Sequence, residues 1–170
     1  MSNQRKQARL PVLGVDVGRV IIAPGDGAAD TSFLHGSERA ALETPATEAC
    51  FETLARLTAA FEGRVFIVSK AGPKVAGRTQ RWFTRWGFFQ ATGIDSRNVR
   101  FCRERSQKRE HCLEHHITHF VDDRLDVLRH LIGLVPALYQ FGAAWKERPE
   151  AAIQPVPCWR SAERAILATL

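Results

Sequence analysis

The sequence lacks any apolar run near the roughly 20 residues that cross a bilayer. No apolar segment of about 7–15 residues follows the basic start MSNQRKQARL, so we interpret it as no secretion signal and expect residues 1–10 to be a disordered tail. The four cysteines form no Cys-x-x-Cys pair, and three lie in apolar-patterned segments, which is typical of buried free thiols. We therefore expect no membrane partner and a reducing, cytoplasmic location.

Internal repeats and low-complexity tracts are also absent, and nothing marks a second domain. A chain of 170 residues with 45% hydrophobic residues can bury a core without disulfides, so we predict a single domain over residues 11–170. The net charge of +6 comes mainly from the tail and from residues 97–110. A nucleic-acid partner is one interpretation; a solvated face together with an anion-attracting site is the favoured one.

What the sequence does contain is an alternation of short apolar runs with amphipathic segments. This pattern predicts right-handed βαβ crossovers and a parallel sheet with helices on both faces, a three-layer, Rossmann-like α/β fold. We expect Thr44, Ser106 and Ser161 to begin three of the helices as N-caps, and Pro136 to lie at a sheet edge or a strand start. The expected strands are 12–17, 64–69, 98–102, 118–123 and 134–142, and the expected helices are 44–63, 73–87, 106–117, 124–133 and 161–170. Pro155 and Pro157 are read as a turn, and residues 23–43, with Gly25 and Gly27, as a loop or flap over the sheet.

Polar residues end three of the predicted strands. Asp16 closes VLGVD, Ser69 closes RVFIVS, and Asp122 and Asp123 close THFVDD. In open parallel sheets, ligands bind outside the carboxyl ends of the strands. We therefore expect these side chains to meet at one rim.

The segments GVDVGRVI, VFIVSK, SQKRE and HFVDDRLDVL occur in the order of the four motifs of the haloacid dehalogenase (HAD) superfamily, and the chain resembles that family over about residues 12–142. The resemblance implies a HAD-like fold and a Mg²⁺-dependent phosphatase. Asp16 would be the nucleophile that forms an aspartyl-phosphate, and Lys108 would neutralise charge on both reacting groups. Ser69 and Lys70 would bind the phosphorylated substrate.

The same resemblance implies a magnesium site. Asp16, Asp122, Asp123 and the backbone carbonyl of Gly18 would hold the ion, since Mg²⁺ binds a few carboxylates and keeps several waters. Adjacent strand residues point to opposite sides, so one Asp of the pair is expected to bind directly and the other through water; Asp122 is our choice for the direct ligand.

The sequence departs from the family pattern at Gly18, where most HAD phosphatases have a second Asp as general acid and base. Three consequences stay open: a substrate with a good leaving group, replacement of the acid by Arg19, Lys70 or a flap residue, or a catalytically impaired domain that binds an anionic ligand or a partner protein. The segment after Asp16 is too short for a helical cap. A capless site suits either a large substrate with an exposed phosphate or closure by oligomerisation.

Each motif also has an interpretation without chemistry. Asp16 alone would be a turn residue, Ser69 an N-cap, Lys108 a solvated helix residue, and Asp122 with Asp123 the cap of the next helix. We favour the HAD-like interpretation because all four would have to fail together.

Two further clusters are considered. His111, His115 and His119 repeat every four residues, a spacing that can bind Zn²⁺, but we expect His119 to lie on the following strand and the histidines to be surface residues. The aromatics in QRWFTRWGFF could stack on nucleic-acid bases, but their helical spacing favours a core role.

Overall fold

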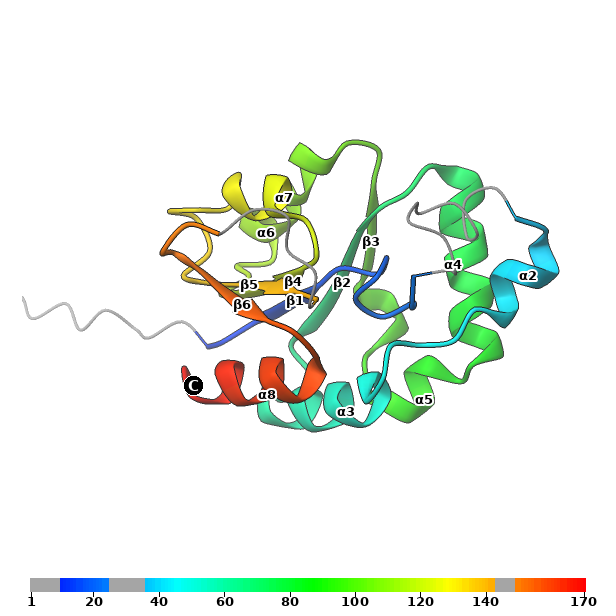
Figure 1. Ribbon diagram of the computed structural model, residues 1–170, viewed down its shortest axis with the longest axis horizontal. Coiled ribbons are helices and arrows are strands. Elements are labelled where there is room, and N and C mark those ends of the chain that lie inside the picture. The colour runs from blue at the N-terminus through cyan, green and yellow to red at the C-terminus, as the bar shows by residue number, and fades with distance from the viewer. Residues whose placement is uncertain (1–9, 25–35, 143–148) are drawn as a thin grey trace, which may run out of the picture.

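The computed structural model describes residues 10–24, 36–142 and 149–170 (Figure 1). Its strands form one parallel sheet in the order β3-β2-β1-β4-β5-β6. The sheet confirms the predicted Rossmann-like α/β fold. The strands are β1 (Leu13–Val15), β2 (Val65–Lys70), β3 (Val99–Cys102), β4 (His119–Asp122), β5 (Ala137–Phe141) and β6 (Ile153–Val156).

Helices cover both faces of this sheet (Figure 1). In the figure α3 and α8 lie below the sheet and α6 and α7 above it, which gives the expected three layers. The α-helices in the described part of the chain are α2 (Glu38–Glu43), α3 (Cys50–Ala60), α4 (Pro73–Arg85), α5 (Phe88–Thr92), α6 (Lys108–Glu114), α7 (Leu125–Arg129) and α8 (Trp159–Leu167).

The sheet separates two hydrophobic clusters because successive strand residues face opposite sides. Leu13 and Val15 of β1 face the cluster that includes residues of α3, α4, α5 and α8. Phe120 of β4 faces the cluster under α6 and α7. Gly14 lies on this second side, where a Cβ atom would be 2.4 Å from Phe120 Cδ2. Glycine is therefore required at position 14 for the Phe120 ring to pack against β1.

The predicted start of the first long helix is wrong. Thr44 ends α2 rather than beginning α3, and its carbonyl oxygen accepts a 2.8 Å hydrogen bond from Trp82 Nε1. The helix begins at Cys50, after Ala49 in the left-handed conformation (φ 60°). Four apolar residues of this segment at helical spacing are all buried: Cys50, Leu54, Leu57 and Phe61.

The other two predicted N-caps are also wrong. Ser106 lies inside a 3₁₀ turn (Arg105–Gln107), and α6 begins only after it, at Lys108. Ser161 is inside α8, where its Oγ accepts a 3.1 Å hydrogen bond from the Cys158 backbone N–H. Both serines lie within two residues of the true helix start, so the helices are where the pattern predicts them but their first turns are displaced.

Three short elements were not predicted: α2, α5 and β6. Residues read as a turn around Pro155 form β6, which lies at the sheet edge, where the missing N–H of proline is tolerated. Pro136 directly precedes β5, which confirms the strand-start alternative. The expected tail is outside the described residues apart from Leu10, and so are Gly25 and Gly27 of the expected flap.

The cysteines and the aromatic segment behave as predicted. Cys50, Cys102 and Cys112 are buried free thiols, whereas Cys158 is exposed. Trp82 is fully buried in the core, although Trp86 at the end of α4 keeps 39% of its surface exposed. Within the described residues, no helix has the length and apolar character to span a membrane.

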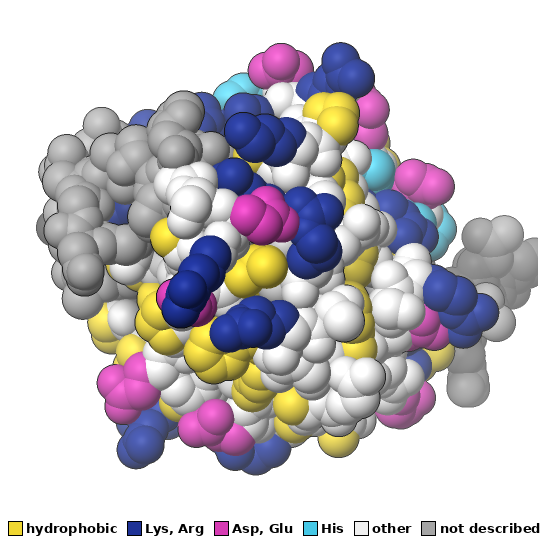
Figure 2. Space-filling view, turned by 90° about the vertical axis from the view of Figure 1, so that its right-hand side faces the viewer, with side chains coloured by type: hydrophobic (Ala, Val, Ile, Leu, Met, Phe, Trp, Pro, Cys, Tyr) yellow, Lys and Arg dark blue, Asp and Glu magenta, His cyan; other side chains and the backbone are white. Residues whose placement is uncertain are grey.

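Positive charge is spread over the face that carries α4, with acidic side chains among the Lys and Arg groups (Figure 2). Arg78 and Arg81 of α4 both pair with Glu38 of α2. Part of the positive charge of α4 is therefore balanced by an acid of the neighbouring helix.

Candidate active site

The predicted polar residues meet at the carboxyl end of the central strands. Asp16 directly follows β1, and its backbone N–H donates a 3.0 Å hydrogen bond to the Val121 carbonyl of β4. Ser69 lies near the end of β2, the neighbour of β1 on the other side. Asp122 ends β4. The order β2-β1-β4 therefore places a hydroxyl and two carboxylates on adjacent strands.

Lys108 is buried between two of these carboxylates. Its Nζ lies 2.6 Å from Asp16 Oδ1 and 2.7 Å from Asp122 Oδ2, and its side chain is 3% exposed. Burial alone would lower the pKa of this ammonium, but the charges of Asp122 and Asp16 raise it above its usual value. The interpretation of Lys108 as a solvated helix residue is therefore wrong, because the first residue of α6 points into the rim.

The two consecutive aspartates have different surroundings. Asp122 is completely buried, and its Oδ1 accepts a 2.9 Å hydrogen bond from the Arg124 backbone N–H. Asp123 instead lines a pocket, and its carboxylate lies 3.6 Å from Arg19 Nε. Burial, followed by the neighbouring carboxylates, raises the pKa of Asp122 to about 6 and that of Asp123 to about 8.

Carboxylate oxygens of Asp16, Asp122 and Asp123 all lie within 4.8 Å of one another. Burial disfavours the charged forms of Asp122 and Asp123 most, and the carboxylates that surround them add repulsion. All-oxygen donors of this kind fit a hard divalent cation, which would offset that repulsion. The residues present are therefore compatible with Mg²⁺.

A pocket of about 150 Å³ opens beside these groups. Its polar lining includes Asp16, Ser69, Lys70, Lys108 and Asp123. Arg19, Arg105 and Arg124 contribute further positive charge, and residues such as Val75 and Val127 form apolar walls. A cavity with this lining attracts an anionic ligand that also has an apolar part.

Two of these arginines were not predicted. Arg124 follows the Asp122–Asp123 pair, and Arg105 precedes Lys108 by three residues. In the sequence, only their closeness to the motifs indicates a role in the site. Loops set the direction of their side chains, and hydrophobic periodicity does not predict loop conformation. Ser69 is not the cap of the next helix, because α4 begins at Pro73 with Gly72 as its N-cap.

Gly18 lies in the pocket wall where the family pattern has an acid. A Cβ atom built on Gly18 would meet no described residue within 4 Å, so the backbone has room for a side chain there. Arg19 follows in the left-handed conformation (φ 63°), and its N–H donates a 2.8 Å hydrogen bond to the Ile22 carbonyl. A non-glycine residue held at this φ is strained, which is common in ligand-binding turns.

No family model and no curated protein matches the sequence. Solved structures do match. A haloacid dehalogenase-like hydrolase from Burkholderia xenovorans LB400 superposes with a TM-score of 0.61 at 12% identity, covering 94% of this chain and 98% of that one. A haloacid dehalogenase-like family hydrolase from Xanthomonas campestris gives a TM-score of 0.63 at 13% identity, covering 94% and 95%.

The chain has a haloacid dehalogenase-like fold. In this HAD-like fold the four sequence motifs lie at the ends of β1, β2 and β4 and at the start of α6. That arrangement explains why motifs separated by up to a hundred residues form one cluster.

His111, His115 and His119, three of the four histidines in the HCLEHHITH segment, do not share a face. His119 lies on β4, as expected, and its ring nitrogens lie within hydrogen-bond distance of Thr118 Oγ1 and Thr169 Oγ1. His111 and His115 remain together on and just after α6, beside Glu114.

Proposed function

We propose that the chain is a Mg²⁺-dependent HAD-like hydrolase, a phosphatase that acts through an aspartyl-phosphate on Asp16. The observation that carries the proposal is the position of the Lys108 ammonium, 2.6 Å from Asp16 and 2.7 Å from Asp122 at the strand ends. Burying a lysine and two acids costs desolvation free energy. Lys108 also lines a pocket that attracts anions, which supports a role for its charge in binding the phosphoryl group.

In the first step, an Asp16 oxygen attacks phosphorus and the ester P–O bond breaks. Lys108 holds Oδ1 of Asp16, so we assign the attack to Oδ2. Lys108 also offsets the negative charge that develops on the phosphoryl oxygens, and Ser69 orients one of them through its hydroxyl. Lys70, at the exposed end of β2, is assigned to binding the substrate's charge. In the second step, water releases phosphate and regenerates the Asp16 carboxylate.

Asp16, Asp122, Asp123 and the Gly18 carbonyl are the proposed ligands of Mg²⁺, which would supply charge stabilisation for the transferring phosphoryl group. Both oxygens of Asp122 already accept hydrogen bonds, from Lys108 and from the Arg124 backbone. Asp123 lines the pocket together with Asp16. This difference favours Asp123 as the direct ligand and Asp122 as the residue that positions Lys108, the reverse of the choice made from the sequence.

Glycine at position 18 limits which substrates are turned over. Positioned acid–base catalysis contributes about 10²–10⁴-fold, and a site without it depends on a leaving group that departs without a proton. The proposed substrates are therefore phosphorylated compounds with acidic leaving groups, either small molecules or phosphates exposed on a larger molecule that fits a capless site. Closure of this site by a second copy of the chain is the alternative to an open site.

Hydrolysis of p-nitrophenyl phosphate tests this function, because its leaving group needs little protonation. We expect Mg²⁺-dependent turnover that disappears in Asp16→Asn and persists in the control Glu48→Gln, which changes an exposed acid that does not line the pocket. A screen of phosphorylated metabolites with the same three proteins would then identify the substrate.

The competing interpretations give different results in these assays. A catalytically impaired domain that binds an anion or a partner protein would bind Mg²⁺ without any turnover. A nucleic-acid-binding module would bind oligonucleotides with an affinity that falls steeply with salt. Either result in place of turnover refutes the phosphatase.

A further inference from the structure

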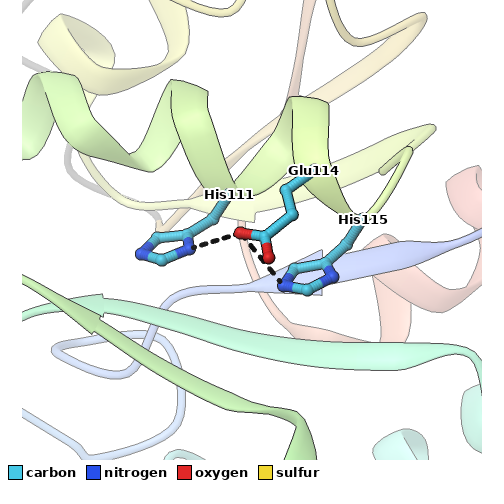
Figure 3. A group of neighbouring side chains, drawn as sticks. All are labelled: His111, Glu114 and His115. Atoms are coloured by element: carbon cyan, nitrogen blue, oxygen red, sulfur yellow. Dashed lines mark ion pairs between the residues drawn. The ribbon is translucent and has the colours of Figure 1, made fainter.

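A second group of metal-ligating side chains lies on α6, outside the pocket that contains Asp16. His111 and Glu114 belong to α6, and His115 is its C-terminal cap (Figure 3). Residues three and four apart share one face of a helix, so the three side chains project together. None of them lines the active-site pocket, although Lys108, the first residue of the same helix, does.

The spacing of the three ligand atoms suits a metal ion. Glu114 Oε2 lies 3.8 Å from His111 Nδ1 and 3.8 Å from His115 Nε2, and the three atoms are all within 4.8 Å of one another. Ligands bound at about 2.0–2.1 Å around a tetrahedral ion are separated by about 3.4 Å. The carboxylate of Glu114 lies between the two imidazoles (Figure 3), so small side-chain rotations bring all three within bonding distance of one point.

His111 carries an independent sign of a missing ligand. Its Nδ1 is buried and has no hydrogen-bond partner among the described residues. Buried polar atoms nearly always have a hydrogen-bond partner, so a buried nitrogen without one indicates a bound ion or a bound water. This nitrogen faces the Glu114 carboxylate (Figure 3), which places it inside the cluster.

His115 is fixed by its neighbours. Its ring stacks on Phe66 of β2 with centroids 4.3 Å apart and planes 11° apart. Its Nε2 accepts a 2.9 Å hydrogen bond from Arg100 Nε. These two contacts hold the ring in one orientation, with Nε2 on the side that faces Arg100 and Glu114.

We propose that His111 Nδ1, Glu114 Oε2 and His115 Nε2 form a binding site for Zn²⁺ or a similar transition-metal ion. Two imidazole nitrogens and one carboxylate are a common zinc set, whereas the all-oxygen Asp16 cluster suits Mg²⁺. Arg100 occupies the His115 lone pair when metal is absent, and it moves aside when the ion binds. A fourth coordination position is left to water.

The bound ion would cross-link three side chains of the last turn of α6. This helix has only seven residues and positions Lys108 at its start. Zinc therefore raises the stability of α6 and of the fold by mass action, because it binds the preformed cluster on the folded helix more tightly than the unfolded chain.

Zinc titration of the untagged protein tests the site, with excess Mg²⁺ present to occupy the Asp16 cluster. We expect one equivalent of Zn²⁺ to compete with a chromophoric chelator and to raise Tm. His111→Ala and His115→Ala should each weaken binding by about tenfold or more, and Glu114→Gln less. Arg100→Met should strengthen binding, because it removes a competing cation. His130→Ala, an exposed histidine on another helix end, is the control and should bind as the wild type does.

Unchanged binding in His111→Ala and His115→Ala, or transfer of the effect to Asp123→Asn, would overturn the proposal, as would no binding by the wild type. Glu114 has a 67% exposed side chain, so its variant keeps the fold and gives a reading even where a histidine variant unfolds. Imidazole ¹⁵N NMR is the second measurement. Zinc must shift the His111 and His115 signals and leave that of His130 in place.

Discussion

Asp123→Asn is expected to stabilise the metal-free protein even though Asp123 is assigned to the metal site. In the folded chain the Asp123 carboxyl lies near Asp16 and Asp122 in a largely buried position. Burial and these carboxylates raise its pKa to about 8, against an ordinary value of 3.8. Asparagine has the shape of the protonated acid and cannot ionise, so the variant folds without taking up a proton.

The size and the sign of this effect follow from the two pKa values. The unfolded chain ionises Asp123 near pH 4 but the folded chain only near pH 8, so wild-type stability falls relative to the variant as pH rises between these values. Each pH unit of pKa difference is worth about 1.36 kcal/mol, which sets a ceiling of about 4 kcal/mol at pH 7. The side chain is 15% exposed and solvent screens part of the effect, so we expect about half of that ceiling.

Urea unfolding in the presence of a chelator measures the difference. The variant should be about 2 kcal/mol more stable than the wild type at pH 7, and the difference should shrink by pH 5. Added Mg²⁺ should stabilise the wild type and reverse the order, because the ion binds only the folded state and needs Asp123. Glu48→Gln, at an exposed residue outside the pocket, should change the free energy of unfolding by less than about 0.5 kcal/mol.

An Asp123→Asn protein that is no more stable than the wild type at pH 8 without metal would refute this reasoning. So would a stability difference that is independent of pH. Either result would mean that burial and the neighbouring carboxylates do not disfavour the ionised form of Asp123, and the electrostatic argument for a divalent cation at the rim would fail with it.

Three further substitutions test other parts of the structure. Lys108→Met should lower p-nitrophenyl phosphate turnover by about 10²–10³-fold and the free energy of urea unfolding by about 3–5 kcal/mol, because two buried carboxylates lose their partner; unchanged stability would contradict the buried ion pairs. Gly14→Ala should cost about 1–3 kcal/mol in the same assay, with partial recovery when combined with Phe120→Leu; strictly additive effects would exclude a steric clash between the new methyl group and the Phe120 ring. Gly18→Asp should raise turnover of alkyl phosphates by about 10²-fold or more and leave p-nitrophenyl phosphate nearly unchanged; equal effects on both substrates would contradict a missing general acid.

The fold could be predicted where burial alone decides the pattern. The runs that contain β1, β2 and β4 are covered on both faces and read as continuous apolar segments. β6 could not be predicted in this way, because it lies at the sheet edge, contains Pro155 and alternates only weakly. The predicted start of α3 was wrong for a different reason. The Trp82 indole N–H donates a hydrogen bond to the Thr44 carbonyl, and helix-capping rules do not include tertiary contacts of this kind.

The positions of the candidate site residues could be predicted because a topological rule applies to them. Parallel strands end at one rim, so Asp16, Ser69 and Asp122 had to meet if the strands were correctly placed. The pocket-lining arginines follow no such rule, since loops set their direction. The near approach of Lys108 to two acids depends on the exact first residue of α6, which lies two positions after the serine expected to cap it.

The sheet also divides the molecule into unequal halves. The cluster on the α3 and α8 side contains Trp82, Trp159 and several Phe rings, whereas the opposite cluster is mainly aliphatic and is covered by α6 and α7, of seven and five residues. The groups assigned to chemistry on α6 and β4, Lys108 and Asp122, thus lie on the side of the aliphatic cluster and its two short helices. A substitution that changes the volume of this aliphatic cluster would therefore shift α6 relative to β4, so core substitutions on this side are expected to alter the candidate site as well as the stability of the fold.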